Sequence, residues 1–78
     1  MTNLSALLQT ACDVFQNEVH SGEEFIVRDL FRGFEWNRIP RGDRTKLGSM
    51  FLVYAQNNGD LIEILDKTPQ NQQRYRKR

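Results

Sequence analysis

The sequence has only one cysteine and one histidine among its 78 residues. Cys12 alone cannot form an internal disulfide bond, which favours a reducing compartment such as the cytoplasm. Cys12 and His20 have no companions at metal-ligand spacing, so we expect no metal and no other cofactor. The chain also lacks an apolar run long enough to span a bilayer, and its start, MTNLSALLQT, lacks the basic region of a signal peptide. A cytoplasmic protein without membrane contact is therefore expected.

The usual arrangements of catalytic residues are missing as well. His20 stands in the polar segment HSGEE, where an exposed turn residue is a simpler interpretation than a general base. The carboxylates of residues 23–35 share no helical face, and the glycines do not form a phosphate-cradling loop. We therefore expect no enzyme activity and no small-molecule substrate.

The composition fits one small folded domain over residues 1–78. Apolar residues make up 38% of the chain, which is enough for a small core. The net charge is only +1, but it is unevenly distributed. Residues 1–37 carry two basic and six acidic side chains, a net charge of −4, whereas residues 38–78 carry nine basic and four acidic ones, a net charge of +5. This asymmetry favours an anionic partner for the C-terminal half.

Two segments have the apolar periodicity of an amphipathic helix. The first covers residues 3–19, with Thr2 or Asn3 as its N-cap and Gly22 as a stop signal. Its apolar residues are Leu4, Leu7, Leu8, Ala11, Phe15 and Val19. The second begins at Pro40 and ends at the segment NNG of residues 57–59. Its apolar face consists of Leu47, Met50, Phe51, Tyr54 and Ala55, and its exposed face includes Arg41, Thr45, Gly48, Ser49 and Leu52.

Shorter elements are expected between and after these helices. The segment FIV of residues 25–27 favours a short strand, and RDLFRG favours a brief helix that ends near Gly33. FEWNRIP is expected to be a turn, because Pro40 biases Ile39 towards an extended conformation. DLIEILDK and QRYRK favour two strands joined by the polar turn TPQNQ. The sequence therefore predicts an α+β domain of three helices, a short strand and a C-terminal β-hairpin.

This order of elements resembles a winged helix-turn-helix domain, in which the third helix is the recognition helix and the closing hairpin is the wing. The segment GEEFIVRDLFRGFEWNRIPRGDRTKLGSMF is also similar to a family of small, functionally uncharacterised proteins from Gram-positive bacteria and their mobile elements. The residues that carry this similarity are Phe25, Asp29, Leu30, Phe31, Trp36, Arg44, Leu47, Gly48 and Phe51. The resemblance implies a winged-helix fold and places the protein in a mobile element or phage.

Basic residues gather at the start of the third helix: Arg38, Arg41, Arg44 and Lys46. The helix dipole already gives this end a positive potential, so the added cations favour a bound phosphate. Arginine side chains also present paired donors to phosphate or to guanine. We expect Arg41, Arg44, Thr45, Lys46 and Ser49 to enter the major groove of double-stranded DNA. The alternative is that Asp43, Glu35 and the acidic first helix neutralise these arginines in surface ion pairs.

The C-terminal hairpin supplies a second basic group. Lys67, Arg74, Arg76 and Lys77 are expected to hold the DNA backbone or minor groove, with residues 73–78 as the basic end of the wing or a frayed tail. Tyr75 should point away from Arg74 and Arg76 and anchor the strand in the core.

The sequence therefore predicts a regulatory DNA-binding module. A rival interpretation is a protein-interaction module that uses the same fold, with the acidic first helix as its working surface. A homodimer or a protein partner is expected in either case, because a single recognition helix covers only one half-site of DNA.

Overall fold

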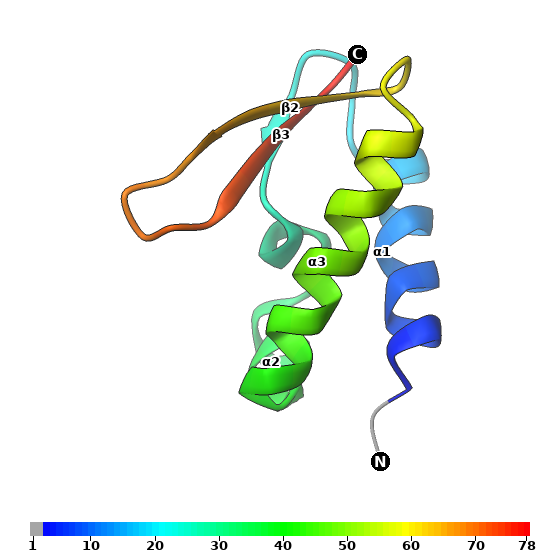
Figure 1. The fold of residues 1–78 in the computed structure, drawn as a ribbon. Helices are drawn as coiled ribbons and strands as arrows, with labels where there is room; N and C mark the ends of the chain where they lie inside the picture. The colour runs from blue at the N-terminus through cyan, green and yellow to red at the C-terminus, as the bar shows by residue number, and fades with distance from the viewer. Residues whose placement is uncertain (1–2) are drawn as a thin grey trace.

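Three α-helices and a three-stranded antiparallel sheet make up the fold of the computed structural model, which describes residues 3–78 (Figure 1). In chain order the elements are α1 (Leu4–Glu18), β1 (Glu24–Phe25), the 3₁₀-helix η1 (Val27–Leu30), α2 (Gly33–Arg38), α3 (Arg41–Asn57), β2 (Ile62–Lys67) and β3 (Gln73–Lys77). The α+β class predicted from the sequence is confirmed at this level.

Helix α1 agrees with the predicted helix within one residue at each end. The side chain of Asn3 caps it by accepting a hydrogen bond from the backbone N–H of Ala6 at 3.1 Å, while Thr2, the other candidate cap, lies outside the described residues. Ala11 and Phe15 are buried on its inner face. Gly22 follows in a turn with a φ of 89°, a left-handed conformation that favours glycine.

The prediction of a turn for FEWNRIP is wrong, because α2 occupies most of this segment. A six-residue helix is too short to display an apolar period, and none of its residues is fully buried. The half-buried Trp36 packs on Phe31, with ring centroids 5.8 Å apart. Ile39 has the extended conformation that a following proline favours, and Pro40 then serves as the N-cap of α3.

Helix α3 crosses the front of the molecule and supplies much of the core (Figure 1). Leu47, Phe51 and Ala55 are buried as predicted, whereas Met50 is only half-buried. Leu52 was expected on the exposed face, but it is half-buried and packs against the core. The inward face of α3 is therefore turned slightly from the predicted one.

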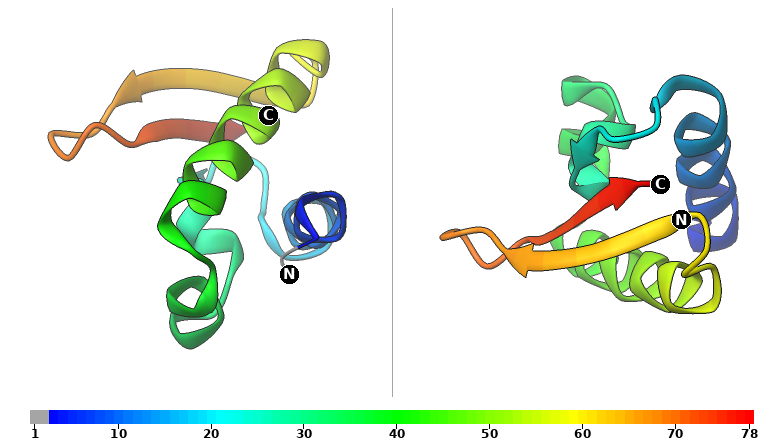
Figure 2. Two further views of the ribbon diagram at one scale, coloured as in Figure 1. Left: turned by 60° about the horizontal axis from the view of Figure 1, so that its bottom comes forward. Right: turned by 90° about the horizontal axis from the view of Figure 1, so that it is seen from above.

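The sheet has the order β1-β3-β2, so the most basic segment of the chain forms its central strand. Tyr75 lies opposite Phe25 on one side and Ile64 on the other. The β2–β3 hairpin projects beyond α3 on the side away from α1, which all three ribbon views show (Figures 1 and 2).

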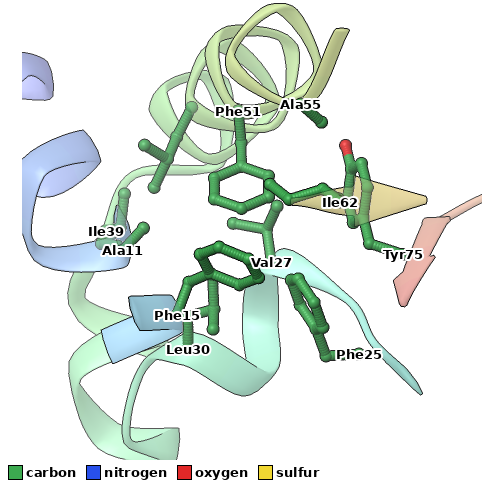
Figure 3. Packing of buried hydrophobic residues seen from close by; sticks show 11 residues of the cluster. Ala11, Phe15, Phe25, Val27, Leu30, Ile39, Phe51, Ala55, Ile62 and Tyr75 are labelled. Atoms are coloured by element: carbon green, nitrogen blue, oxygen red, sulfur yellow. The ribbon is translucent and has the colours of Figure 1, made fainter. Parts of the chain in front are cut away.

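Aromatic rings fill the space between the sheet, α1 and α3 (Figure 3). Tyr75 and Phe51 are completely buried, with ring centroids 5.1 Å apart. Phe15 and Phe25 complete the cluster, with centroids 5.5 Å apart. Because the rings come from α1, β1, α3 and β3, this cluster fixes the angle at which the hairpin leaves α3.

Candidate nucleic-acid interface

A concave surface of about 480 Å³ lies between α3 and the β2–β3 hairpin, with η1 and α2 closing its far side. We call it the basic cleft. Its lining residues are Ile26, Val27, Arg28, Trp36, Arg41, Arg44, Thr45, Gly48, Ser49, Leu52, Lys67, Asn71, Gln72, Gln73 and Tyr75. Four elements spread over residues 26–75 therefore form one surface.

The charge of the basic cleft has one sign. Arg28 from η1, Arg41 and Arg44 from α3, and Lys67 from the end of β2 line it, and no carboxylate in the described part of the chain does so. Sequence reasoning identified three of these four cations. It missed Arg28, because nothing local to η1 indicates that the fold brings this residue to α3.

Arg44 is held in the cleft without a carboxylate partner. Its guanidinium carbon lies 5.9 Å from the centroid of the Trp36 ring, at the outer limit of a cation–π contact. Its Nε is buried and has no hydrogen-bond partner within residues 3–78. Trp36 thus supports the side chain while leaving its charge unneutralised.

The structure does not show the ion pairs that were the alternative explanation for these arginines. Neither Arg41 nor Arg44 forms an ion pair within residues 3–78. Glu35 instead pairs with Arg32, the N-cap residue of α2, with Nε and Oε1 3.7 Å apart. The positive charge at the start of α3 is therefore available to an external anion.

Small residues form the wall of the cleft on α3. The hydroxyl of Thr45 donates to the carbonyl of Arg41 at 3.2 Å, and that of Ser49 donates to the carbonyl of Thr45 at 3.3 Å. Each hydroxyl keeps its acceptor lone pairs. Nothing lies within 4 Å of the position that a Cβ on Gly48 would take, so the helix backbone is open to the cleft there.

Two predicted contact residues near α3 lie outside the lining of the cleft. Lys46 is exposed on another face of the helix. Arg38, at the end of α2, places its guanidinium carbon 5.1 Å from the centroid of the exposed Phe34 ring. Both side chains are accessible, but the fold does not bring them together with the four cations of the cleft.

Arg74 and Arg76 do not line the cleft, and each pairs with carboxylates. Arg76 contacts Glu24 at 3.1 Å and Glu63 at 3.2 Å, and Arg74 contacts Glu24 at 3.6 Å. The hydrogen bond that Arg76 donates to Glu24, followed by the charge of Glu63, raises the pKa of Arg76. Tyr75 between them faces the core, so these arginines lie on the outer face of the sheet. Their charges are largely neutralised within the domain.

The ammonium group of Lys77 is bound within the domain and is not free at the surface. Its Nζ donates to the carbonyl oxygens of Phe15 and Gln16, each at 3.1 Å, and lies 4.9 Å from the centroid of the Phe15 ring. These carbonyls belong to the last turn of α1, where the helix dipole attracts a cation. Lys77 therefore joins the end of the central strand to the end of the first helix.

Tyr75 lies at the floor of the cleft. Its side chain is completely buried, and its hydroxyl has no hydrogen-bond partner within residues 3–78. Burial raises the pKa of Tyr75 to about 12. The sequence predicted that Tyr75 anchors the strand, but it gave no indication that the hydroxyl would lack a partner.

No group of three or more His, Cys, Asp or Glu side chains within residues 3–78 could hold a metal ion. Cys12 is half-buried, and desolvation raises the pKa of its thiol. Within the same residues, no helix has the length and apolar character needed to cross a membrane.

Comparison with known proteins gives one match. The family model described as "Domain of unknown function (DUF1413)" matches residues 15–77, which include the whole basic cleft. No curated protein and no solved structure matches the chain.

Proposed function

The chain belongs to the DUF1413 family, and we propose that it binds double-stranded DNA through the basic cleft, as a winged-helix regulatory module. In this proposal α3 is the recognition helix and the β2–β3 hairpin is the wing. The order of elements and the sheet order β1-β3-β2 support this assignment. The hairpin projects beside α3, which would let both elements approach one duplex (Figure 2).

One observation carries the proposal: four cations line a concave surface that has no carboxylate among the described residues. Like charges held together repel one another, and a surface of one sign attracts a polyanion over roughly 8 Å at physiological salt. On the outer face of the sheet, by contrast, Glu24 pairs with Arg74 and Arg76. The unpaired cations of the cleft therefore mark the surface to which an external anion should bind most strongly.

The contacts would divide between backbone and bases. Lys67 from the hairpin and Arg28 from η1 suit phosphates, which give affinity without sequence choice. Arg41, exposed on the first turn of α3, and Arg44 also suit phosphates, which leaves Thr45 and Ser49 on the same wall to reach base edges. Four phosphate contacts would give a slope of log affinity against log salt of about −3.6.

A salt titration with a matched pair of double variants tests the proposal. Arg41→Gln/Arg44→Gln removes two positive charges from the cleft. Arg74→Gln/Arg76→Gln removes an equal number of positive charges from the outer face of the sheet. We expect the first variant to weaken binding to a generic duplex and to reduce the salt slope by about 1.8. The second variant should bind nearly as the unmodified protein does. Equal weakening in both variants would mean that net charge, and not the cleft, determines binding.

The second candidate function is docking to a protein partner. Within residues 3–78, four large apolar side chains are at least 40% exposed: Phe34, Val53, Leu61 and Ile64. Such residues are common on a monomer, but they are also the anchors that protein interfaces use. A folded protein that fails to bind any duplex at low salt would favour this function over DNA binding.

A further inference from the structure

The floor of the basic cleft differs chemically from its rim. The apolar and aromatic lining residues, Ile26, Val27, Trp36, Leu52 and Tyr75, are buried or half-buried and make up the floor, whereas Arg28, Arg41 and Lys67 are exposed at the rim. A duplex is broad and keeps its bases stacked inside, so its phosphates reach the walls and leave the floor unfilled. The volume of about 480 Å³ lies in the range of pockets that hold small molecules.

Two polar groups among the lining residues lack partners in the part of the chain that is described. The Nε of Arg44 and the hydroxyl of Tyr75 are both buried without a hydrogen bond. Figure 3 shows the Tyr75 oxygen directed towards α3, the helix that forms one wall of the cleft. Both atoms lie below the solvent-accessible surface, so they mark the depth of the cleft and are not themselves contact points for a ligand.

We propose that the basic cleft binds a small anion with a planar apolar body, of the nucleoside monophosphate class, and that this ligand competes with DNA. The phosphate would lie between Arg41 and Arg44, where the positive charge has no internal partner. The base would rest on the apolar floor beside Trp36, because an unpaired base, unlike one in a duplex, is free to stack. Amides of the hairpin turn, Asn71 and Gln72, lie at the rim within the same lining and can bond the base edge.

Binding of the nucleotide does not depend on the proposed function, whereas competition with DNA does. Both would use Arg41 and Arg44, and one phosphate at these residues excludes another. The nucleotide would therefore release the protein from DNA, which gives the regulatory module a chemical signal.

Trp36 is the only tryptophan of the chain and lines the cleft, so its fluorescence reports occupancy directly. The full chain is titrated at low salt with three probes: adenosine 5′-monophosphate, inorganic phosphate and adenosine. We expect saturable quenching by the monophosphate, with each of the other two binding at least about tenfold more weakly, because each supplies only half of the contacts. Inorganic phosphate that binds as tightly as the monophosphate would overturn the assignment of the apolar floor.

Variants then locate the site. Arg44→Gln should weaken binding of the monophosphate by at least about tenfold, since it removes a charged donor. Arg41→Gln serves as a second variant if Arg44→Gln does not fold, as judged by circular dichroism. Arg74→Gln, on the outer face of the sheet, should leave the affinity unchanged. Equal loss in Arg74→Gln, or none in the cleft variants, would overturn the proposal.

A competition experiment separates this proposal from the proposed function. The monophosphate should displace a labelled duplex at concentrations that match its own dissociation constant. Duplex binding without any binding of the monophosphate would overturn the ligand site and leave DNA binding standing. Binding of the monophosphate without duplex binding would overturn DNA binding and leave the ligand site standing. If both bind without competing, the shared use of Arg41 and Arg44 is wrong.

Discussion

The hydroxyl of Tyr75 should lower the stability of the folded domain, so Tyr75→Phe should raise that stability. The ring is completely buried and contacts Phe25 and Phe51, with centroids 5.6 and 5.1 Å away, and phenylalanine preserves both contacts. The substitution removes only an oxygen that has no partner within residues 3–78. A buried polar group without a hydrogen bond costs about 1–3 kcal/mol.

The expected gain is about 1 kcal/mol, because part of the cost is recovered by small adjustments around the hydroxyl. For a domain of this size, such a gain raises the melting temperature by about 4–8 °C. Tyr54→Phe is the matched control. The Tyr54 hydroxyl is half-buried and accepts a hydrogen bond from Gln16 Nε2 at 3.4 Å, so its removal should change stability by less than about 0.5 kcal/mol.

The same substitution should change how stability depends on alkaline pH. Burial raises the pKa of Tyr75 from 10.0 to about 12 in the folded state. The unfolded chain therefore loses this proton first, and the folded state loses stability as pH rises from about 10 to about 12. A shift of this size corresponds to about 2–3 kcal/mol. Tyr75→Phe should lack this component, so the gain over the unmodified protein should widen above pH 10.

Urea denaturation followed by circular dichroism measures both effects, at pH 7 and at steps between pH 9 and 12. The slope against urea should stay constant, because the substitution leaves the compactness of both states unchanged. A Tyr75→Phe variant that is less stable at pH 7 would refute the reasoning, because it would mean that the hydroxyl has a hydrogen bond in solution. A difference between the two proteins that does not change above pH 10 would refute the assigned pKa.

The remaining predictions concern the core, the end of α1 and the start of α3. Phe51→Ala should destabilise the domain by about 3–5 kcal/mol in urea denaturation. Ser49→Ala on the cleft wall should change stability by less than about 0.5 kcal/mol. Similar effects of the two substitutions would mean that α3 is wrongly oriented. Lys77→Met should lower stability by about 1–2 kcal/mol, because the last carbonyls of α1 lose a cationic donor, and an unchanged melting temperature would contradict this role. Arg41→Gln/Arg44→Gln should leave the melting temperature unchanged or slightly higher, because each cation opposes the helix dipole by about 0.3–1 kcal/mol; a clear loss would indicate internal pairing.

Elements with a repeating pattern could be predicted from the sequence. The period of 3.6 residues located α1 and α3, and the capping role of Asn3 was visible because a cap acts on the nearest turn. The hairpin followed from two β-prone runs around a polar turn that contains Pro69. Helix α2 was missed, since a helix of six residues shows less than two turns of any pattern and is held by its neighbours.

The candidate site was only partly predictable. The sequence identified Arg41 and Arg44, because a cluster of cations at a helix N-terminus is a local feature. It could not distinguish these free arginines from Arg74 and Arg76, which look equally basic along the chain. Their partner Glu24 lies about fifty residues away and reaches them only because β1 pairs with β3.

The sequence by itself thus determined the helices, the hairpin and the sign of the charge in each half, since these depend on residues within a few positions of one another. The tertiary structure alone decided which cations are neutralised and which face a common cleft. Electrostatic pairing depends on distance through space, and the fold brings Arg28 to α3 while it turns Arg76 towards Glu63. The separation of free charge on the cleft from paired charge on the outer sheet is therefore a property of the packed domain.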